Sequence, residues 1–152
     1  MSCPTSWRSS IPSSQSAHYR IWGYVDASTS WGIGILIGCR WAAFCLLNGW
    51  KISGREICWL ESIAIEFLFY FLEAMQVSHT NLLIHSDSQG AIGAFEKGCC
   101  PNWHINLAIC RSFPILARNS IHPSFTYIES ASNPVDPIFR GLLPHVDLKI
   151  DT

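Results

Sequence analysis

Three short runs of apolar, β-branched and aromatic residues open the patterned part of the chain. The first, 19–26, ends before the polar residues 28–30, and two further runs, 32–38 and 41–47, follow with few residues between them. This enrichment over short runs indicates strands, and such short connections indicate hairpins. We therefore expect a meander of three antiparallel strands, of which the first ends in the carboxylate of Asp26.

The period changes to that of a helix between about residues 56 and 76. Counted from Glu61, apolar residues recur at +3, +4, +7 and +11, which places them on one face of a helix. Glu61 heads this face, whereas Glu66 and Glu73 lie about 140° and 120° around the helix. We expect Glu61 to share the face that packs on the sheet and the other two glutamates to be solvated.

The second half of the chain alternates strands and helices. Residues 81–87 form a short apolar run that ends in a second carboxylate, and 88–98 have the serine cap and glycine stop of a short helix. A helix over about 102–119 contains a proline, which we expect to kink or interrupt it. A last strand over 124–129 completes the pattern.

These elements predict one mixed sheet flanked by helices. The crossover through the helix is right-handed and most simply lays the strand 81–87 parallel to the first strand. Asp26 and Asp87 then end side by side, about 4.8 Å apart across parallel strands, at the carboxyl edge where open α/β sheets bind ligands. Glu61 on the packed helix face and Asp136 after the last strand add two further carboxylates.

Four neighbouring carboxylates with little compensating charge need a cation. For any one of them alone a turn or a helix cap is the simpler interpretation, and only the set favours a metal site. Oxygen ligands without histidine or cysteine favour Mg²⁺ or Mn²⁺, and such a set can hold two ions roughly 4 Å apart. That arrangement suits the cleavage of a phosphodiester. The candidate metal-binding and catalytic residues are Asp26, Glu61, Asp87 and Asp136.

At these residues the sequence resembles the ribonuclease H domains of retroelement and hepadnavirus-type reverse transcriptases. The matching motifs occupy residues 24–28, 61–66, 85–90 and 133–141. They occur in the family's order, and the resemblance covers about residues 19–143. The last motif is the most specific, because the family pattern of Asn-Pro-x-Asp followed by Ser-Arg-Gly is seldom met outside the family.

The resemblance implies an α/β ribonuclease H-like fold, whose five-stranded mixed sheet has the order 3-2-1-4-5, and hydrolysis of the RNA strand of RNA/DNA hybrids. Asp26 would bridge two Mg²⁺ or Mn²⁺ ions, and Asp136 would complete the ion that activates the attacking water. Glu61 and Asp87 would hold the ion at the leaving 3′ oxygen. The chain would then derive from a retroelement reverse transcriptase and lack its partner domain.

Substrate contacts are harder to read than the metal site. Ser28, Gln89 and Asn133, beside the carboxylates, are placed to reach the minor groove and sense 2′-hydroxyls, which distinguish RNA from DNA. Arg140 is a further candidate substrate-binding residue, although Phe139 stands where the family usually has serine. We expect the tryptophans to be core or former domain-interface residues rather than base-stacking platforms; they include Trp31, Trp41, Trp50, Trp59 and Trp103.

Composition limits the class of protein further. The 152 residues suffice for one domain, and we expect a serine-rich leader over 1–17, the domain over 18–143 and a tail over 144–152. The net charge of -1 predicts a weak grip on nucleic acid. Seven cysteines without a C-x-x-C pair indicate buried, reduced thiols in a cytoplasmic or nuclear protein. We expect no membrane span and no secretory signal.

Two other functions stay open on the sequence. The chain is also compatible with a catalytically inactive module that keeps the fold and binds nucleic acid or docks onto a protein. A third interpretation keeps the metal site but changes the chemistry to that of another nuclease or a strand transferase of the same fold. The complete set of four acids favours the ribonuclease.

Overall fold

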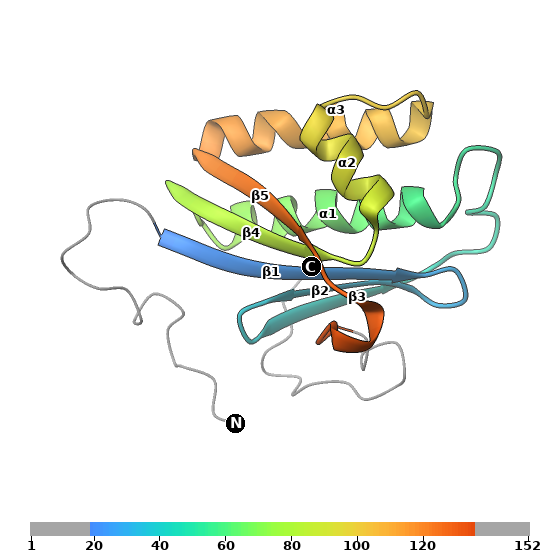
Figure 1. Cartoon of the computed structure of the whole chain (residues 1–152), viewed down its shortest axis with the longest axis horizontal. Coiled ribbons are helices and arrows are strands. Elements are labelled where there is room, and N and C mark those ends of the chain that lie inside the picture. Colours follow the sequence, from blue (N-terminus) through green and yellow to red (C-terminus); the bar gives the residue numbers. More distant parts are fainter. Residues whose placement is uncertain (1–18, 136–152) are drawn as a thin grey trace.

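The computed structural model describes residues 19–135, which form a five-stranded mixed sheet with three helices (Figure 1). Antiparallel and parallel pairing meet at the central strand, which is antiparallel to one neighbour and parallel to the other. The strand order β3-β2-β1-β4-β5 confirms the predicted order. The strands are β1 (Tyr19–Ser28), β2 (Gly32–Ile37), β3 (Arg40–Cys45), β4 (Thr80–Ser86) and β5 (Ile121–Tyr127).

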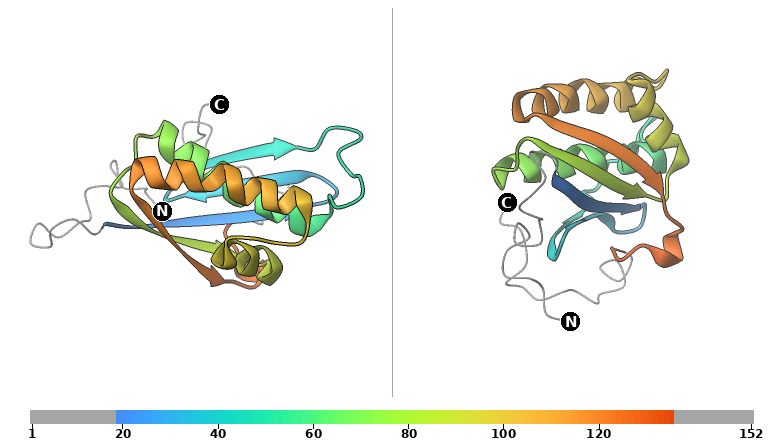
Figure 2. Two further views of the ribbon diagram at one scale, coloured as in Figure 1. Left: turned by 90° about the horizontal axis from the view of Figure 1, so that it is seen from above. Right: turned by 60° about the vertical axis from the view of Figure 1, so that its left-hand side comes forward.

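The three helices gather on one face of the sheet (Figure 2). They are α1 (Ile57–Ala74), α2 (Gln89–Lys97) and α3 (Trp103–Asn119), and a 3₁₀ turn, η1 (Ser130–Ser132), follows β5. The apolar stripe predicted for the first helix is fully buried against the sheet. Gly23 of β1 lets α1 come close, because a Cβ atom there would lie 2.9 Å from the Leu68 side chain.

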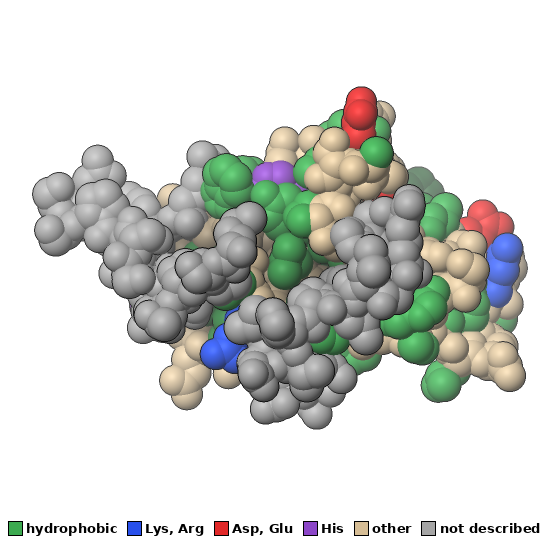
Figure 3. Space-filling view, turned by 90° about the horizontal axis from the view of Figure 1, so that it is seen from below, with side chains coloured by type: hydrophobic (Ala, Val, Ile, Leu, Met, Phe, Trp, Pro, Cys, Tyr) green, Lys and Arg blue, Asp and Glu red, His purple; other side chains and the backbone are tan. Residues whose placement is uncertain are grey.

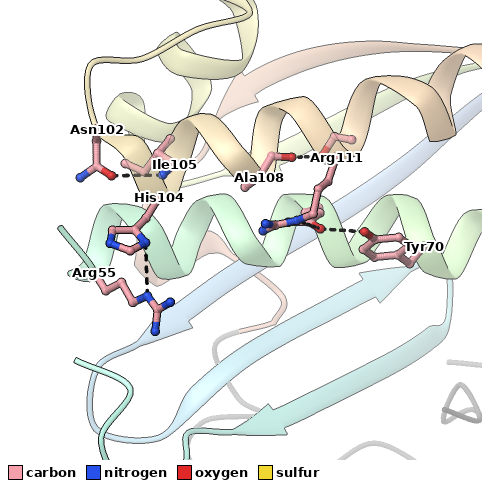
Figure 4. A network of polar contacts seen from close by, with 9 residues as sticks. Arg55, Tyr70, Asn102, His104, Ile105, Ala108 and Arg111 are labelled. Carbon is pink, nitrogen blue, oxygen red and sulfur yellow. Dashed lines mark hydrogen bonds and ion pairs between the residues drawn. The ribbon is translucent and has the colours of Figure 1, made fainter. Parts of the chain in front are cut away.

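Glu66 corrects one expectation, because it is only 3% exposed rather than solvated. Its two carboxylate oxygens accept hydrogen bonds of 2.8 and 2.9 Å from the Arg111 guanidinium of α3, and the Tyr70 hydroxyl donates a third of 2.8 Å (Figure 4). The helical pattern identified the face of α1 toward the sheet but not the second face, which α3 covers. Glu73 lies further along and pairs with Arg118 in a more exposed position.

The short helix α2 begins and ends where its sequence predicts. The Ser88 hydroxyl accepts a hydrogen bond of 3.2 Å from the Ala91 N–H, and Gly98 ends the helix with a φ of 79°. Asn102 caps α3 in the same way, by accepting the Ile105 N–H at 3.1 Å. Pro114 lies inside α3 without ending it, so the expected interruption does not occur.

The second face of the sheet carries aromatic and apolar side chains (Figure 3). His85 of β4 stacks on Tyr24 of β1 with ring centroids 4.2 Å apart, and Trp22 beside it is 50% exposed. Trp41 of β3 and Val135 are buried against each other on this face. The described chain therefore ends packed against the sheet.

Two further expectations concern the cysteines and the absence of a membrane-spanning helix among the described residues. No cysteine among the six within residues 19–135 is fully buried, so the prediction of buried thiols is wrong for them, although all six are free. None of the described helices is long and apolar enough to cross a membrane.

Candidate metal centre

Three of the four predicted carboxylates come from three different elements that meet at one edge of the sheet. Asp26 lies near the carboxyl end of β1, and Asp87 directly follows β4. The parallel register pairs Tyr24 with His85. Asp26 and Asp87 each follow their residue of this pair by two positions, so they are level with each other on neighbouring strands. Glu61 projects from the second turn of α1, and one oxygen from each of the three residues lies within 4.8 Å of the others.

The neighbouring backbone and hydroxyl groups hold two of these carboxylates. Asp26 is 5% exposed, and its Oδ1 accepts the Ala27 N–H at 2.9 Å. Asp87 is half-buried, and its Oδ2 accepts a hydrogen bond from the Ser130 hydroxyl of η1. The segment after β5 therefore contacts the centre directly. Asp136 and Arg140, predicted as a fourth ligand and a substrate contact, lie outside the described residues.

Glu61 is the most perturbed group of the cluster. Burial, followed by the charges of Asp87 and Asp26, raises the pKa of Glu61 to about 10, and a backbone hydrogen bond from Ala27 offsets this in part. Glu61 is 3% exposed, and its Oε2 has no hydrogen-bond partner within the part of the chain that the structure describes. A buried carboxylate oxygen in this state is costly unless a proton or a cation satisfies it.

The donor set therefore fits a hard divalent cation. Three carboxylates whose oxygens lie within 4.8 Å repel one another when ionised, and Mg²⁺ or Mn²⁺ prefers such oxygen ligands. The unpartnered Glu61 oxygen is an atom that such an ion would satisfy. Asp26, Glu61 and Asp87 are the described residues that would hold the metal.

A pocket of about 260 Å³ opens onto this centre, and four of its lining residues were not predicted as site residues: Ala27, Ile57, Cys58 and Ser88. Cys58 stands one turn before Glu61 on α1, and Ser88 follows Asp87. Burial raises the pKa of the Cys58 thiol, which a hydrogen bond with Ser88 partly offsets. The helical spacing between residues 58 and 61 was a signal that could have identified Cys58.

The predicted substrate contacts differ in how accessible they are. Gln89 is exposed at the first position of α2, and the half-buried Ser28 hydroxyl lies 2.9 Å from that of Ser30. Asn133 is only 2% exposed, and its side chain is occupied within the protein. Its Nδ2 donates to the Val25 carbonyl at 3.0 Å, and its Oδ1 accepts the Val135 N–H at 3.1 Å. These hydrogen bonds make Asn133 an anchor of its segment, and its role as a substrate contact stays a prediction.

The sheet order and the helices on one face define a ribonuclease H-like fold. Among the solved structures similar to this chain is ribonuclease H1 from the halophilic archaeon Halobacterium salinarum NRC-1, with a TM-score of 0.58. The match covers 78% of this chain and 92% of that one at 13% identity, which shows a shared fold. No family model matches the sequence, and no curated protein matches it.

Proposed function

We propose that the chain is a metal-dependent endoribonuclease that hydrolyses the RNA strand of RNA/DNA hybrids. The observation that carries the proposal is the cluster of Asp26, Glu61 and Asp87, with oxygens within 4.8 Å at the carboxyl edge of the sheet. The similarity of the fold to that of an archaeal ribonuclease H1 supports it. The motif at residues 133–141 makes Asp136 the proposed fourth ligand.

In this proposal each residue of the centre has a defined task. When bound, Mg²⁺ or Mn²⁺ ions would supply a nucleophilic water near neutral pH and offset the charge on the leaving oxygen. Asp26, fixed by the Ala27 N–H, and Asp87, oriented by the Ser130 hydroxyl, present carboxylates that need little reorganisation. Glu61 must give up a proton before it can act as a ligand, because its pKa is raised to about 10.

Recognition of the hybrid would use polar groups beside the acids. Ser28 follows Asp26 by two residues, as Gln89 follows Asp87, so both are proposed to reach the minor groove. Arg140 remains a proposed contact on its sequence motif alone. The sequence resemblance also supports an origin in a retroelement reverse transcriptase, with a partner domain that strengthens binding. Such a substrate agrees with the cytoplasmic or nuclear location predicted above.

A second candidate function is a catalytically inactive module that binds nucleic acid or docks onto a protein. Arg111 and Arg118, the two arginines of α3, are both paired with glutamates of α1. They are therefore less available to phosphates, and the net charge of the chain is -1. This observation favours weak substrate binding, and only an activity measurement separates the two functions.

The test is cleavage of a labelled RNA/DNA hybrid at low salt with millimolar Mn²⁺, and with EDTA in its place. We expect cleavage of the RNA strand that disappears with EDTA, and single-stranded RNA and duplex DNA should be spared. Asp26→Asn and Asp87→Asn should each lower the rate at least about 100-fold, as loss of a group that stabilises transition-state charge does. Glu96→Gln, at an exposed position of α2, is the matched control. A folded protein that binds Mn²⁺ without cleaving the hybrid would favour the inactive module.

A further inference from the structure

A second pocket, of about 340 Å³, lies at the end of the sheet where β1 turns into β2. Its walls are the β1–β2 turn, residues 29–31, and the start of the loop between β3 and α1, residues 46–51. The Leu46 N–H donates to the Trp31 carbonyl at 2.8 Å, which holds the two walls together. The pocket is therefore built from the two segments that flank the β2–β3 hairpin.

The side chains around this pocket combine aromatic, polar and cationic groups. Trp31 and Trp50 are both half-buried, and Trp50 also packs against the hydrophobic core, as the sequence predicted. Trp50 is held from behind by Trp59, whose ring is nearly parallel at 10° with centroids 6.3 Å apart. Thr29, Ser30 and Asn48 add hydroxyl and amide groups, and of the described lining residues Lys51 alone carries a charge.

The second pocket borders the end of β1 that carries Asp26. Thr29 lies in the turn after β1 and follows Asp26 by three residues, so the Cα atoms of the two residues are at most about 11 Å apart. A nucleic-acid strand whose phosphodiester lies at the carboxylates would therefore bring a nearby nucleotide of the same strand to the second pocket.

We propose that the second pocket binds a nucleobase and its adjoining phosphate in a single-stranded portion of nucleic acid. Base stacking on aromatic side chains combined with a nearby cation is the usual way in which proteins hold single strands without sequence preference. Trp31 and Trp50 supply the aromatic surfaces and Lys51 the cation. The inference rests on the proposed function, because it assumes that the cleaved phosphodiester lies at the carboxylates. It deepens that function by adding a subsite for the strand beyond the cleaved bond.

The test measures binding without catalysis. The full chain in EDTA is titrated against a fluorescein-labelled deoxythymidine oligonucleotide of about ten nucleotides, a length within the usual site sizes, and the anisotropy is followed. Trp31→Leu should weaken binding at least about 5-fold, because stacking of one base is worth that much or more. Lys51→Ser should weaken binding at low salt and reduce the slope of log K against log salt by about 0.7. Trp22→Leu, on the second face of the sheet, and Lys97→Ser, at the end of α2, are matched controls that should bind like the wild type.

The outcomes separate this inference from the proposed function. Weaker binding by both pocket variants supports the subsite even if the wild-type protein fails to cleave a hybrid. Equal binding by pocket and control variants overturns the subsite, even if the wild type cleaves, and so does a wild-type chain that does not bind the oligonucleotide at low salt. Urea unfolding of each variant checks folding, and Lys51→Ser at an exposed position keeps the test decisive if Trp31→Leu fails to fold.

Discussion

Binding of Mn²⁺ to the metal-free protein should release close to one proton from Glu61 near neutral pH. Burial, then the charges of Asp87 and Asp26, raises the pKa of Glu61 to about 10. A pH of about 7 is roughly three units below this pKa, so the Glu61 carboxyl group is almost entirely protonated there. A carboxyl group must be ionised to act as a metal ligand, so the proton has to leave.

The size of the effect follows from the displacement of one proton. Over the range in which Glu61 is protonated, the apparent affinity for Mn²⁺ should rise about tenfold per pH unit. Between about pH 6 and pH 8 this amounts to a factor of roughly 100, or about 2.7 kcal/mol of binding free energy.

The same group makes the stability of the metal-free protein depend on pH. The folded-state pKa of Glu61 lies above its unfolded value of 4.5. Its contribution to stability is therefore fully present below about pH 4.5 and is lost as the pH rises toward about 10. Mn²⁺ at saturation binds the folded protein with Glu61 ionised, so the metal-bound protein does not lose stability in this way. The difference in melting temperature between the protein with Mn²⁺ and the protein with EDTA should therefore grow with pH across this window.

Isothermal titration calorimetry in two buffers of different ionisation enthalpy counts the released protons directly. Glu61→Gln removes the titrating proton while keeping a similar shape, so it should release none and should bind Mn²⁺ weakly at every pH. Glu96→Gln serves again as the exposed control. Binding of Mn²⁺ by the wild type with no proton release and no change in affinity between about pH 6 and pH 8 would refute the reasoning, since Glu61 would then be ionised without metal.

Three further predictions concern stability, each measured by urea unfolding. Arg111→Met should lower the free energy of unfolding by about 2 kcal/mol, because it leaves the buried Glu66 carboxylate without its cation. The loss is smaller than for a fully buried pair, since the Arg111 side chain is 46% exposed. Arg118→Met at the exposed pair should cost far less, and equal losses for the two variants would contradict the burial argument. Gly32→Ala should lower the free energy of unfolding by at least about 3 kcal/mol, because its Cβ would lie 1.7 Å from a backbone oxygen of β3. Gly93→Ala, where the added Cβ meets open space, should stabilise α2 by about 0.5 kcal/mol. If Gly32→Ala were instead the more stable of the two variants, the strand would be able to move away from the added Cβ. Asn133→Ala should lower the free energy of unfolding by about 2 kcal/mol, because two hydrogen bonds are lost. It should also lower hybrid cleavage if the segment that Asn133 anchors positions Asp136 at the metal centre. Unchanged stability would mean that the two hydrogen bonds of Asn133 are not needed.

Local signals in the sequence predicted the elements and three of the acids. The Ser88 cap and the Gly98 stop delimit α2, and the right-handed crossover brought Asp26 and Asp87 to one edge of the sheet. The strand β5 begins at Ile121, earlier than expected, and contains Pro123. This strand pairs with β4 alone, and an edge strand tolerates proline.

What the sequence did not reveal depends on contacts between distant segments. Glu66 is buried because α3 packs over α1, and a periodicity within one helix carries no information about a second covering layer. The anchoring of Asn133 depends on the Val25 carbonyl, a backbone group that any residue at that position would offer. A pattern of side chains along the chain therefore predicts faces and ends of elements, but not which backbone group a distant amide meets.

The parallel pairing of β1 with β4 has a consequence for how the chain folds. The β1–β2–β3 meander closes through short turns, whereas β1 meets β4 only after α1 and its connections have been brought into place. Contacts between segments so distant in sequence form slowly, because the chain loses loop entropy before it gains them. Asp26 and Asp87 flank this late pairing, so the growing or refolding chain would bring these proposed metal ligands together only when the sheet closes. Metal binding would then serve as a kinetic probe of that step.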